Sequence, residues 1–225
     1  MDWSLPPNFS THGDVIDQLF WIILGLTGLA FVLVEGGIIW FLVRYRGTPS
    51  RRAHYTHGSN RLEVVWTVIP AVIIVVLGGY SAMVWDDIKN ENKFPEDALE
   101  FTVIGKQFEW NVVYPGVDEV LGTSDDFEVR NQFHFPAGEN VIVNLRSEDV
   151  IHSFFIPELR VKQDAVPGMD NIRIWFDSRE PGQFEIACAE LCGLGHYRME
   201  ASVTAHARAD FDAWQASQVA ENGGE

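Results

Sequence analysis

Both cysteines of the chain lie within one short segment near its C-terminus, at Cys188 and Cys192. His196 follows the second cysteine by four residues, and Met199 follows the histidine by three. Thiolate, imidazole and thioether groups together form the ligand set that suits copper. A mononuclear blue-copper site needs a single thiolate, so two thiolates indicate a site that holds two metal ions. This segment predicts a function more directly than any other part of the sequence.

The sequence around the segment predicts a loop held between two strands. Residues 183–187 alternate between apolar and polar side chains, as a half-buried strand does, and a further strand is predicted from Glu200. Gly193 and Gly195 give the intervening backbone the freedom to fold back on itself. We therefore expect Cys188 to follow the first strand directly and the four ligand side chains to converge on one point.

The region 99–206 is predicted to be an all-β Greek-key sandwich or barrel, because short β-type stretches alternate there with turn signals. The predicted strands are Leu99–Val103, Phe127–Arg130, Asn140–Arg146, Asn171–Phe176, Gln183–Ala187 and Glu200–Thr204. A polar linker, 86–98, precedes the region, and a short helix with an acidic tail is predicted over 207–225. The sequence contains no glycine-rich phosphate loop after a strand and no hydrolase nucleophile elbow, which argues against the enzyme classes that depend on them.

Two long apolar runs come before this region, over 19–43 and 62–85. Each is long enough to cross a bilayer core of ~30 Å as a helix, and the first is too long, and lacks the positive flank, for an ordinary cleaved signal peptide. The loop 44–61 carries five arginines and no acidic residue. By the positive-inside rule this loop is cytoplasmic. The N-terminal segment 1–18, the C-terminus and the β region are then expected on the outer side of the cell membrane.

The outer region carries almost all of the net charge. Residues from Asp86 onward include 27 acidic and 11 basic side chains, which gives a net charge of −16, equal to that of the whole chain. A field of this kind repels anions, nucleic acids among them, and steers cationic partners at low salt. Halophilic proteins use the same balance, because salt screens the self-repulsion. We therefore expect a halophilic source and no nucleic-acid partner.

A second imidazole is needed if two metal ions each bind one histidine, and six further histidines are available. His12, His54 and His57 lie before or between the apolar runs, His206 lies beyond the last predicted strand, and His134 precedes a turn. The remaining one, His152, follows the predicted strand 140–146 within the loop 147–153. We expect His152 to be the second histidine ligand.

A disulfide between Cys188 and Cys192 is the alternative reading, because the outer compartment is oxidising. Such a bond would close a very small loop and contribute little stability. It would also leave His196 and Met199 without a role. The metal interpretation accounts for all four residues and is the one that we favour.

Two motifs of the chain resemble subunit II of the haem–copper terminal oxidases of the cytochrome c oxidase type, and the resemblance covers nearly the whole chain. The first motif reads His152-Ser-Phe-Phe-Ile-Pro157, and the second is the segment from Cys188 to Met199. The resemblance implies a two-helix transmembrane hairpin joined to a cupredoxin-like domain outside the cytoplasm. It also implies a dinuclear copper A centre in that domain.

The resemblance implies six copper-binding residues, which supply two bridging thiolates, one imidazole for each copper ion and two weak axial ligands. In that order they are Cys188 and Cys192, His152 and His196, and Met199 with the backbone carbonyl of Glu190. The side chain of Glu190 would also reach a magnesium ion at the contact with subunit I. Most ligands of that magnesium ion would belong to another chain.

The resemblance further implies a subunit that relays electrons in the respiratory chain, with the oxygen chemistry in another subunit. A soluble or membrane-tethered donor, either a cytochrome c or a small blue-copper protein, would reduce the copper centre. The electrons would pass to the haem–copper centre of subunit I, where oxygen is reduced to water with proton translocation. The segment Gly105-Lys-Gln-Phe-Glu-Trp110 resembles an aromatic stretch of the family, so Phe108 and Trp110 are expected to form the aromatic face that accepts the electron.

The segment from Glu63 to Pro70 resembles the start of the second helix of the family. An ionisable group at the edge of an apolar helix is a functional candidate in its own right. The resemblance implies that Glu63 forms the entrance of a proton pathway into subunit I. A glutamate that reaches the interface by snorkelling is the alternative.

Four other functions compete with this interpretation. A membrane-anchored, thioredoxin-like copper chaperone would carry its histidine downstream of the cysteines and would need alternating strands and helices. A quinol oxidase subunit II would lack the copper ligands. A copper A subunit of a nitric-oxide reductase would share the centre, although the hairpin and Glu63 favour the oxygen-reducing complex. A simple adhesive β domain would leave the whole ligand set unexplained.

Overall fold

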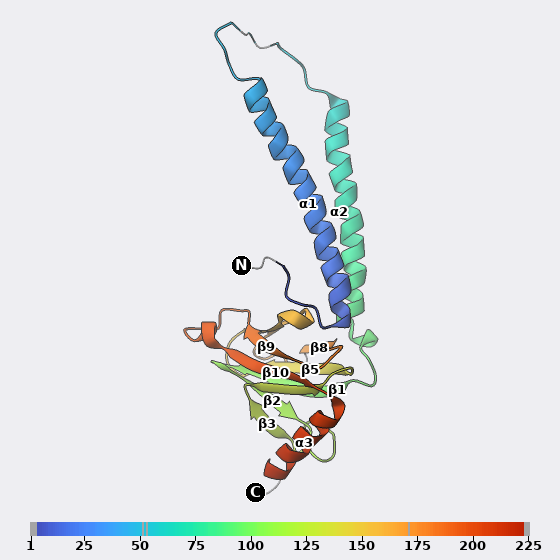
Figure 1. Cartoon of the computed structure of the whole chain (residues 1–225), viewed down its shortest axis with the longest axis vertical. Coiled ribbons are helices and arrows are strands. Elements are labelled where there is room, and N and C mark those ends of the chain that lie inside the picture. Colours follow the sequence, from blue (N-terminus) through green and yellow to red (C-terminus); the bar gives the residue numbers. More distant parts are fainter. Residues whose placement is uncertain (1–3, 51, 53, 171, 223–225) are drawn as a thin grey trace. The chain divides into compact units, whose positions relative to one another are not determined.

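The computed structural model describes residues 4–50, 52, 54–170 and 172–222. The chain forms two compact units, of which one is Val15–Asp87 and the other combines the N-terminal residues up to Asp14 with Ile88 onward. The first unit is helical, and the second is a β domain followed by a C-terminal helix (Figure 1).

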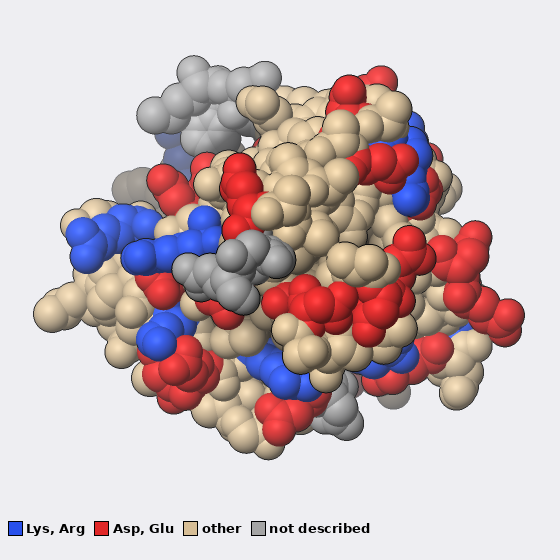
Figure 2. Space-filling model, turned by 90° about the horizontal axis from the view of Figure 1, so that it is seen from below, with Lys and Arg blue, Asp and Glu red and all other residues tan. Residues whose placement is uncertain are grey.

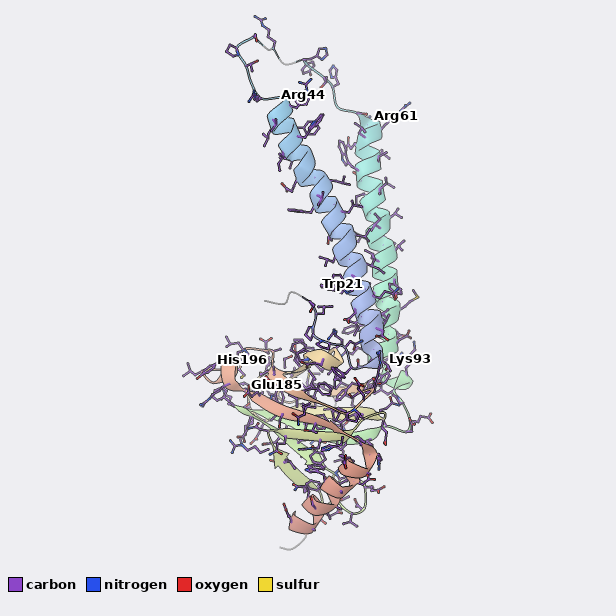
Figure 3. All side chains as sticks on the ribbon, viewed as in Figure 1. Trp21, Arg44, Arg61, Lys93, Glu185 and His196 are labelled. Carbon is purple, nitrogen blue, oxygen red and sulfur yellow. The ribbon has the colours of Figure 1, made fainter. Side chains whose placement is uncertain are left out.

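Two long helices, α1 (Thr11–Arg44) and α2 (Asn60–Lys89), contain the two apolar runs. With a rise of 1.5 Å per residue, the 30 residues of α2 extend about 45 Å, more than a bilayer core of ~30 Å requires. Both helices are long and apolar enough to cross a membrane. Arg44 and Arg61 lie at the helix ends that adjoin the connecting loop (Figure 3), so the basic charge flanks the apolar stretches.

The helix α1 begins at Thr11, earlier than the predicted start at Leu19. The Ser10 hydroxyl caps it by accepting a hydrogen bond of 3.1 Å from the main-chain N–H of Gly13. The main-chain N–H and the hydroxyl of Thr11 both donate to Asp177 Oδ1, each at 2.9 Å. Because of these polar contacts, the helix begins within the polar segment that precedes the apolar run.

The β domain consists of two five-stranded sheets. Its strands are β1 (Leu99–Lys106), β2 (Glu109–Tyr114), β3 (Phe127–Arg130), β4 (Gln132–Pro136), β5 (Asn140–Ser147), β6 (His152–Ile156), β7 (Val161–Ala165), β8 (Ile172–Asp177), β9 (Gly182–Cys188) and β10 (Glu200–His206). The strand orders are β3-β2-β1-β5-β8 and β4-β10-β9-β6-β7. The pairs β1–β5 and β4–β10 are parallel and the other pairs are antiparallel. The predicted all-β sandwich is therefore confirmed.

Four strands, β2, β4, β6 and β7, lie where no strand was predicted. Most residues of β2 and β6 are buried, so these strands lack the alternation that marks a half-buried strand. The strand β6 matters most, because it corrects the placement of His152. This residue is the first of a strand and does not lie in the loop 147–153.

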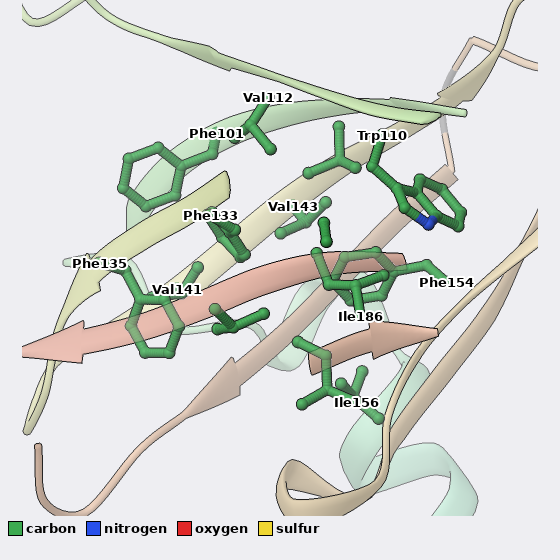
Figure 4. Close-up of a cluster of buried hydrophobic side chains, with 14 of the residues drawn as sticks. Phe101, Trp110, Val112, Phe133, Phe135, Val141, Val143, Phe154, Ile156 and Ile186 are labelled. Atoms are coloured by element: carbon green, nitrogen blue, oxygen red, sulfur yellow. The ribbon is translucent and has the colours of Figure 1, made fainter. Parts of the chain in front are cut away.

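Aromatic and branched side chains fill the space between the sheets (Figure 4). Phe133 from β4 lies edge-on to Phe101 of β1, with ring centroids 5.5 Å apart, and Phe154 of β6 stacks near Phe176 of β8. Burial of each such ring contributes about 1.5–3 kcal/mol. The aromatic core thus packs the two sheets against each other.

Acidic side chains are spread over much of the surface that Figure 2 shows, and basic side chains are fewer. This distribution agrees with the net charge of −16. Acidic groups spread in this way repel one another at low ionic strength. The halophilic source remains a prediction.

The C-terminal helix α3 (Arg208–Asn222) is anchored by Phe211, which is buried, and by a cluster of aromatic rings that the sequence did not predict. Trp214 stacks on the His134 ring with centroids 4.2 Å apart. His134 Nδ1 and His206 Nε2 are 2.8 Å apart, so one imidazole donates a hydrogen bond to the other. Burial and the nearby His206 lower the pKa of His134 to about 4.

We expect the β domain to lose stability as the pH falls from 6.5 towards 4. The folded chain resists protonation of His134, whereas the unfolded chain binds the proton near the ordinary pKa of 6.5. Neutral His134 thus contributes to the free energy of unfolding, and the contribution is complete above pH 6.5. It amounts to about 1–2 kcal/mol, a value reduced by solvent screening of this half-buried group. Urea unfolding of the full chain in detergent, at pH 7.5 and pH 5, measures the change. The substitution His134→Gln should remove this part of the pH dependence; an unchanged dependence would assign it to other groups.

Candidate metal centre

Two neighbouring strands bring the predicted ligands together. The strand β6 begins with His152, and β9 ends with Cys188, so the cysteine belongs to the strand and does not follow it. These strands pair antiparallel, with Phe154 opposite Cys188. The main-chain N–H of Ala189 also donates to the carbonyl of Ser153 at 3.0 Å. The sheet thereby places side by side two residues that are 36 positions apart in the sequence.

The ligand atoms form a continuous row. The two sulfur atoms of Cys188 and Cys192 lie 3.8 Å apart. His152 Nδ1 is 3.9 Å from the sulfur of Cys188, and His196 Nδ1 is 3.8 Å from the sulfur of Cys192. The Met199 sulfur lies 3.7 Å from that of Cys192. The structure therefore brings all five side chains together in one cluster.

Both cysteines are free thiols and both are buried. Their separation of 3.8 Å exceeds the roughly 2.05 Å of a disulfide, so the disulfide alternative does not describe this structure. His152, Cys188 and Cys192 are all buried, and their ligand atoms lie within 4.8 Å of one another. The carbonyl of Glu190 lies 3.2 Å from the Cys188 sulfur, while the Glu190 side chain is exposed. Buried thiols with imidazole neighbours fit a soft metal such as copper.

The local field favours one thiolate at a time. Burial opposes ionisation of Cys188 most strongly, but the hydrogen bonds with His152, Ser153, Glu190 and His196 together outweigh it and lower the pKa of Cys188 to about 6. Burial and the charge of Cys188 raise the pKa of Cys192 to about 11. Cys188 is therefore the first of the two thiols to ionise. A metal cation would deprotonate both thiols, because its charge stabilises the second thiolate.

His152 is held on the side away from the sulfur by Asp149, which the sequence did not single out. His152 Nε2 lies 2.8 Å from Asp149 Oδ1. The same carboxylate accepts hydrogen bonds from the main-chain N–H groups of Gln107, at 2.8 Å, and of Val150, at 2.6 Å. Although burial disfavours its charge, these bonds keep the pKa of Asp149 below its ordinary value. The arrangement leaves Nδ1 of His152 free to bind a metal ion.

The turn between β1 and β2 covers the loop that bears the ligands. A Cβ atom at Gly193 would lie 2.8 Å from Gln107 Nε2, and one at Gly195 would lie 2.5 Å from Phe108 Cγ. Gly193 also has a φ of +134°, a conformation that other residues rarely adopt. Both glycines thus permit a close approach of the turn, and Gly193 is required for its backbone conformation as well.

The two residues of the expected aromatic face differ in burial. Trp110 is completely buried, and its ring lies edge-on to His152 with centroids 5.9 Å apart. Trp110 therefore does not contribute to the surface, and its part in electron entry stays a prediction. Phe108 is half-buried beside the ligand loop and remains a candidate. Exposed apolar side chains in the segment that bears the other ligands include Leu191, Leu194 and Tyr197.

The remaining predicted residue, Glu63, lies in the first turn of α2 and is exposed there. It belongs to the helical unit, and the ligand residues belong to the β domain. Its role in proton entry stays a prediction.

Comparison with known proteins agrees with this geometry. Residues 99–206 match the family described as cytochrome c oxidase subunit II, periplasmic domain, and residues 3–84 match its transmembrane domain. The alternative cytochrome c oxidase subunit 2 of Bradyrhizobium diazoefficiens is 33% identical over 240 residues, which cover 96% of this chain and 84% of that protein. Cytochrome c oxidase subunit 2 of Thermostichus vulcanus is 30% identical over 263 residues, with 94% and 77% covered.

The β domain also resembles a solved structure. The crystal structure of the periplasmic domain of subunit II of cytochrome oxidase from Bradyrhizobium japonicum matches with a TM-score of 0.50 and 26% identity. The match covers 57% of this chain and 98% of that domain. The likeness extends over essentially all of the solved domain.

Proposed function

The chain belongs to the cytochrome c oxidase subunit II family, and we propose that His152 and the segment from Cys188 to Met199 hold the copper A centre of that family. Membership of this family makes the chain a membrane-bound subunit of a terminal oxidase, an electron-transporting oxidoreductase complex. Its partners are the other subunits of the oxidase. The predicted resemblance is therefore confirmed.

The observation that carries the proposal is a row of two free thiols between two imidazoles, with neighbouring ligand atoms 3.8–3.9 Å apart. In this proposal both thiolates would hold a pair of copper ions, which would supply reversible storage of one electron. His152 and His196 would each supply one imidazole. The Met199 sulfur and the carbonyl of Glu190, which lie next to Cys192 and Cys188, would complete the ligand set. Soft thiolate ligands spread the charge over both ions.

The protein contributes a rigid scaffold and a buried environment for the ligands. Cys188, Cys192 and Met199 are buried, and the strand pair β6–β9 fixes the spacing between His152 and Cys188. A site that changes little between two redox states needs a scaffold of this kind, and its apolar surroundings also tune the potential. The site is therefore suited to passing electrons, with the reaction on oxygen taking place in subunit I.

The donor reduces the centre at its exposed side. We assign the accepting position to Phe108, which packs against Gly195 beside the His196 ligand. The donor is a cytochrome c or a small blue-copper protein, for which an acidic domain provides cationic steering at low salt. The exposed Glu190 side chain is free to bind a magnesium ion at the contact with subunit I.

The chain is a membrane protein whose β domain corresponds to a periplasmic domain. In the proposed topology α1 and α2 both cross the membrane. The basic loop between them lies in the cytoplasm, because arginines accumulate on that side. Both termini then lie outside, together with the copper centre. Single cysteines introduced into the loop and near the termini test this orientation, because a membrane-impermeant thiol reagent should label only the termini in intact cells.

We expect Glu63→Gln to slow oxygen reduction by the assembled oxidase by a factor on the order of 100 or more, because a well-placed proton-transfer group contributes about 10²–10⁴-fold. The reason is that the amide keeps the shape of the side chain and cannot carry a proton. Oxygen consumption measures the rate, and the copper spectrum should stay unchanged. The conservative variant Glu63→Asp should recover much of the activity. A Glu63→Gln oxidase with full activity would contradict the proton-entrance role.

The central test uses the full chain, purified in detergent without metal and then supplied with copper. Metal analysis should give two copper ions per chain, and the EPR spectrum should show one unpaired electron shared by both. One copper ion with a localised spin, or no binding, would overturn the proposal.

The fold, the ligand set and the relatives disfavour the alternative functions. The described residues of the β domain form two sheets and do not show the alternating helices and strands of a thioredoxin-like copper chaperone. The free thiols and imidazoles disfavour a quinol oxidase subunit, which needs no copper ligands. The nitric-oxide reductase alternative shares the centre, but the relatives are oxidase subunits.

A further inference from the structure

The copper-ligand side chains come from two separate parts of the chain, and both must keep their position when the centre changes its redox state. His152 stands at the start of β6, whereas the other ligands lie at the end of β9 and in the loop after it. The pairing of β6 with β9 fixes Cys188 but does not reach Cys192, which is four residues further on. Another contact must therefore hold the Cys192 end of the loop relative to His152.

Gln107, in the turn between β1 and β2, makes contacts with both parts. Its side-chain amide donates a hydrogen bond of 2.5 Å to the carbonyl of Cys192. Its main-chain N–H donates one of 2.8 Å to Asp149 Oδ2, and the other oxygen of this carboxylate lies 2.8 Å from His152 Nε2. A chain of hydrogen bonds thus runs from the His152 imidazole through Asp149 and Gln107 to the main chain of Cys192.

We propose that Gln107 is a positioning residue of the copper centre, which couples the orientation of His152 to the position of Cys192. This inference rests on the proposed copper function and adds a residue to it. Gln107 does not touch the ligand atoms. It acts through Asp149 on one side and through the Cys192 carbonyl on the other.

The two ends of the bridge have different physical effects. At the His152 end, Asp149 holds the proton on Nε2, so that Nδ1 faces Cys188, and its charge makes the imidazole a better electron donor. At the Cys192 end, the amide holds a carbonyl beside Gly193, whose φ of +134° the loop must maintain. Loss of the amide would let this loop relax.

The experiment compares Gln107→Glu with the native full chain. Glutamate keeps the length and shape of glutamine, but an ionised carboxylate cannot donate to the Cys192 carbonyl. In the copper-loaded chain we expect copper to transfer to a chelator about 10–100-fold faster, the usual cost of an outer-shell change. We also expect altered hyperfine-shifted NMR signals from the His152 ring, which Gln107 does not contact. Unchanged His152 signals would overturn the coupling.

A second variant isolates the carboxylate. Asp149→Asn keeps the shape and removes the charge, so the reduction potential of the centre should rise, because the oxidised copper loses electron donation from His152. The matched control is Glu148→Gln, which alters the neighbouring carboxylate. Glu148 pairs with exposed Lys106 at 2.9 Å, and its replacement should leave both copper release and potential unchanged. Equal effects at positions 148 and 149 would overturn the proposal.

A copper-free arm separates this inference from the copper assignment. Cys192 is 4% exposed, so its alkylation by iodoacetamide requires the loop to open. In the metal-free chain Gln107→Glu should speed alkylation of Cys192, identified by mass spectrometry, by about tenfold or more. If the native chain binds no copper, the copper proposal fails, and this rate still decides whether Gln107 positions the loop. An unchanged alkylation rate would show that it does not.

Discussion

Replacement of Cys192 by serine is expected to abolish the dinuclear copper signal. The sulfur of Cys192 lies at the middle of the ligand set, within 3.8 Å of the Cys188 sulfur and His196 Nδ1 and 3.7 Å from the Met199 sulfur. A serine hydroxyl is a harder ligand that stays protonated at neutral pH, so it cannot bridge two copper ions as a thiolate does. The copper content of Cys192→Ser should fall from two ions per chain to one or none, and electron transfer to the oxidase should be lost.

The measurement combines metal analysis, EPR and oxygen consumption of the assembled complex. Serine is close to cysteine in size, so the β domain should remain folded, which circular dichroism verifies. Met199→Leu is the graded comparison, because a weak axial ligand tunes the potential without holding the pair of ions together. That variant should keep two copper ions and shift their potential. A Cys192→Ser chain that still shares one electron between two copper ions would refute the bridging assignment.

The sequence allowed a direct prediction of the Cys188–Met199 segment because its chemistry is local. Four ligand side chains lie in one short segment of the sequence, and their types restrict the choice of metal more than any geometry does. The two apolar helices could also be predicted, since each long apolar run is visible in the sequence itself. His152 was reached by elimination among the histidines, and the structure provides its reason, the pairing of β6 with β9.

Other features depend on contacts that periodicity does not encode. The strands β2 and β6 are buried along most of their length, which hides their alternation. Trp110 was expected in the aromatic face that accepts the electron because the stretch around it resembles an aromatic one of the family, and its burial in the core beside His152 could not be predicted from that resemblance. The bridge joins Gln107 to Asp149 and to Cys192, which lie 42 and 85 positions further along the chain. No spacing rule relates these residues.

The same reasoning explains why the glycines of the ligand loop have two different roles. Gly193 has a backbone conformation that a side chain disfavours, whereas Gly195 has an ordinary φ of −92°. At Gly195 the constraint is space, because the Phe108 ring occupies the volume that a Cβ atom would need. The two positions can therefore be distinguished by removing the ring.

Gly195→Ala is expected to weaken copper binding, and the removal of the Phe108 side chain is expected to restore it. The added methyl group forces the Phe108 ring or the loop beside His196 to move, at a cost of about 1–3 kcal/mol, which corresponds to roughly 5- to 150-fold in copper affinity. In the double variant Gly195→Ala/Phe108→Ala the methyl group finds empty space, so the affinity recovers. Competition with a chelator measures it.

Gly193→Ala is the matched control, because it lies beside the same ring and fails for a different reason. Its φ of +134° penalises any side chain, so Phe108→Ala should not rescue it. Electron transfer from the donor should stay slow in each chain that lacks Phe108, even where copper is fully bound, because the proposed accepting ring is absent. A double variant no better than Gly195→Ala would mean that the loop is not limited by space. Rapid reduction of a copper-loaded Phe108→Ala chain would move the accepting position elsewhere, with the exposed Leu191, Leu194 and Tyr197 the next surface to test.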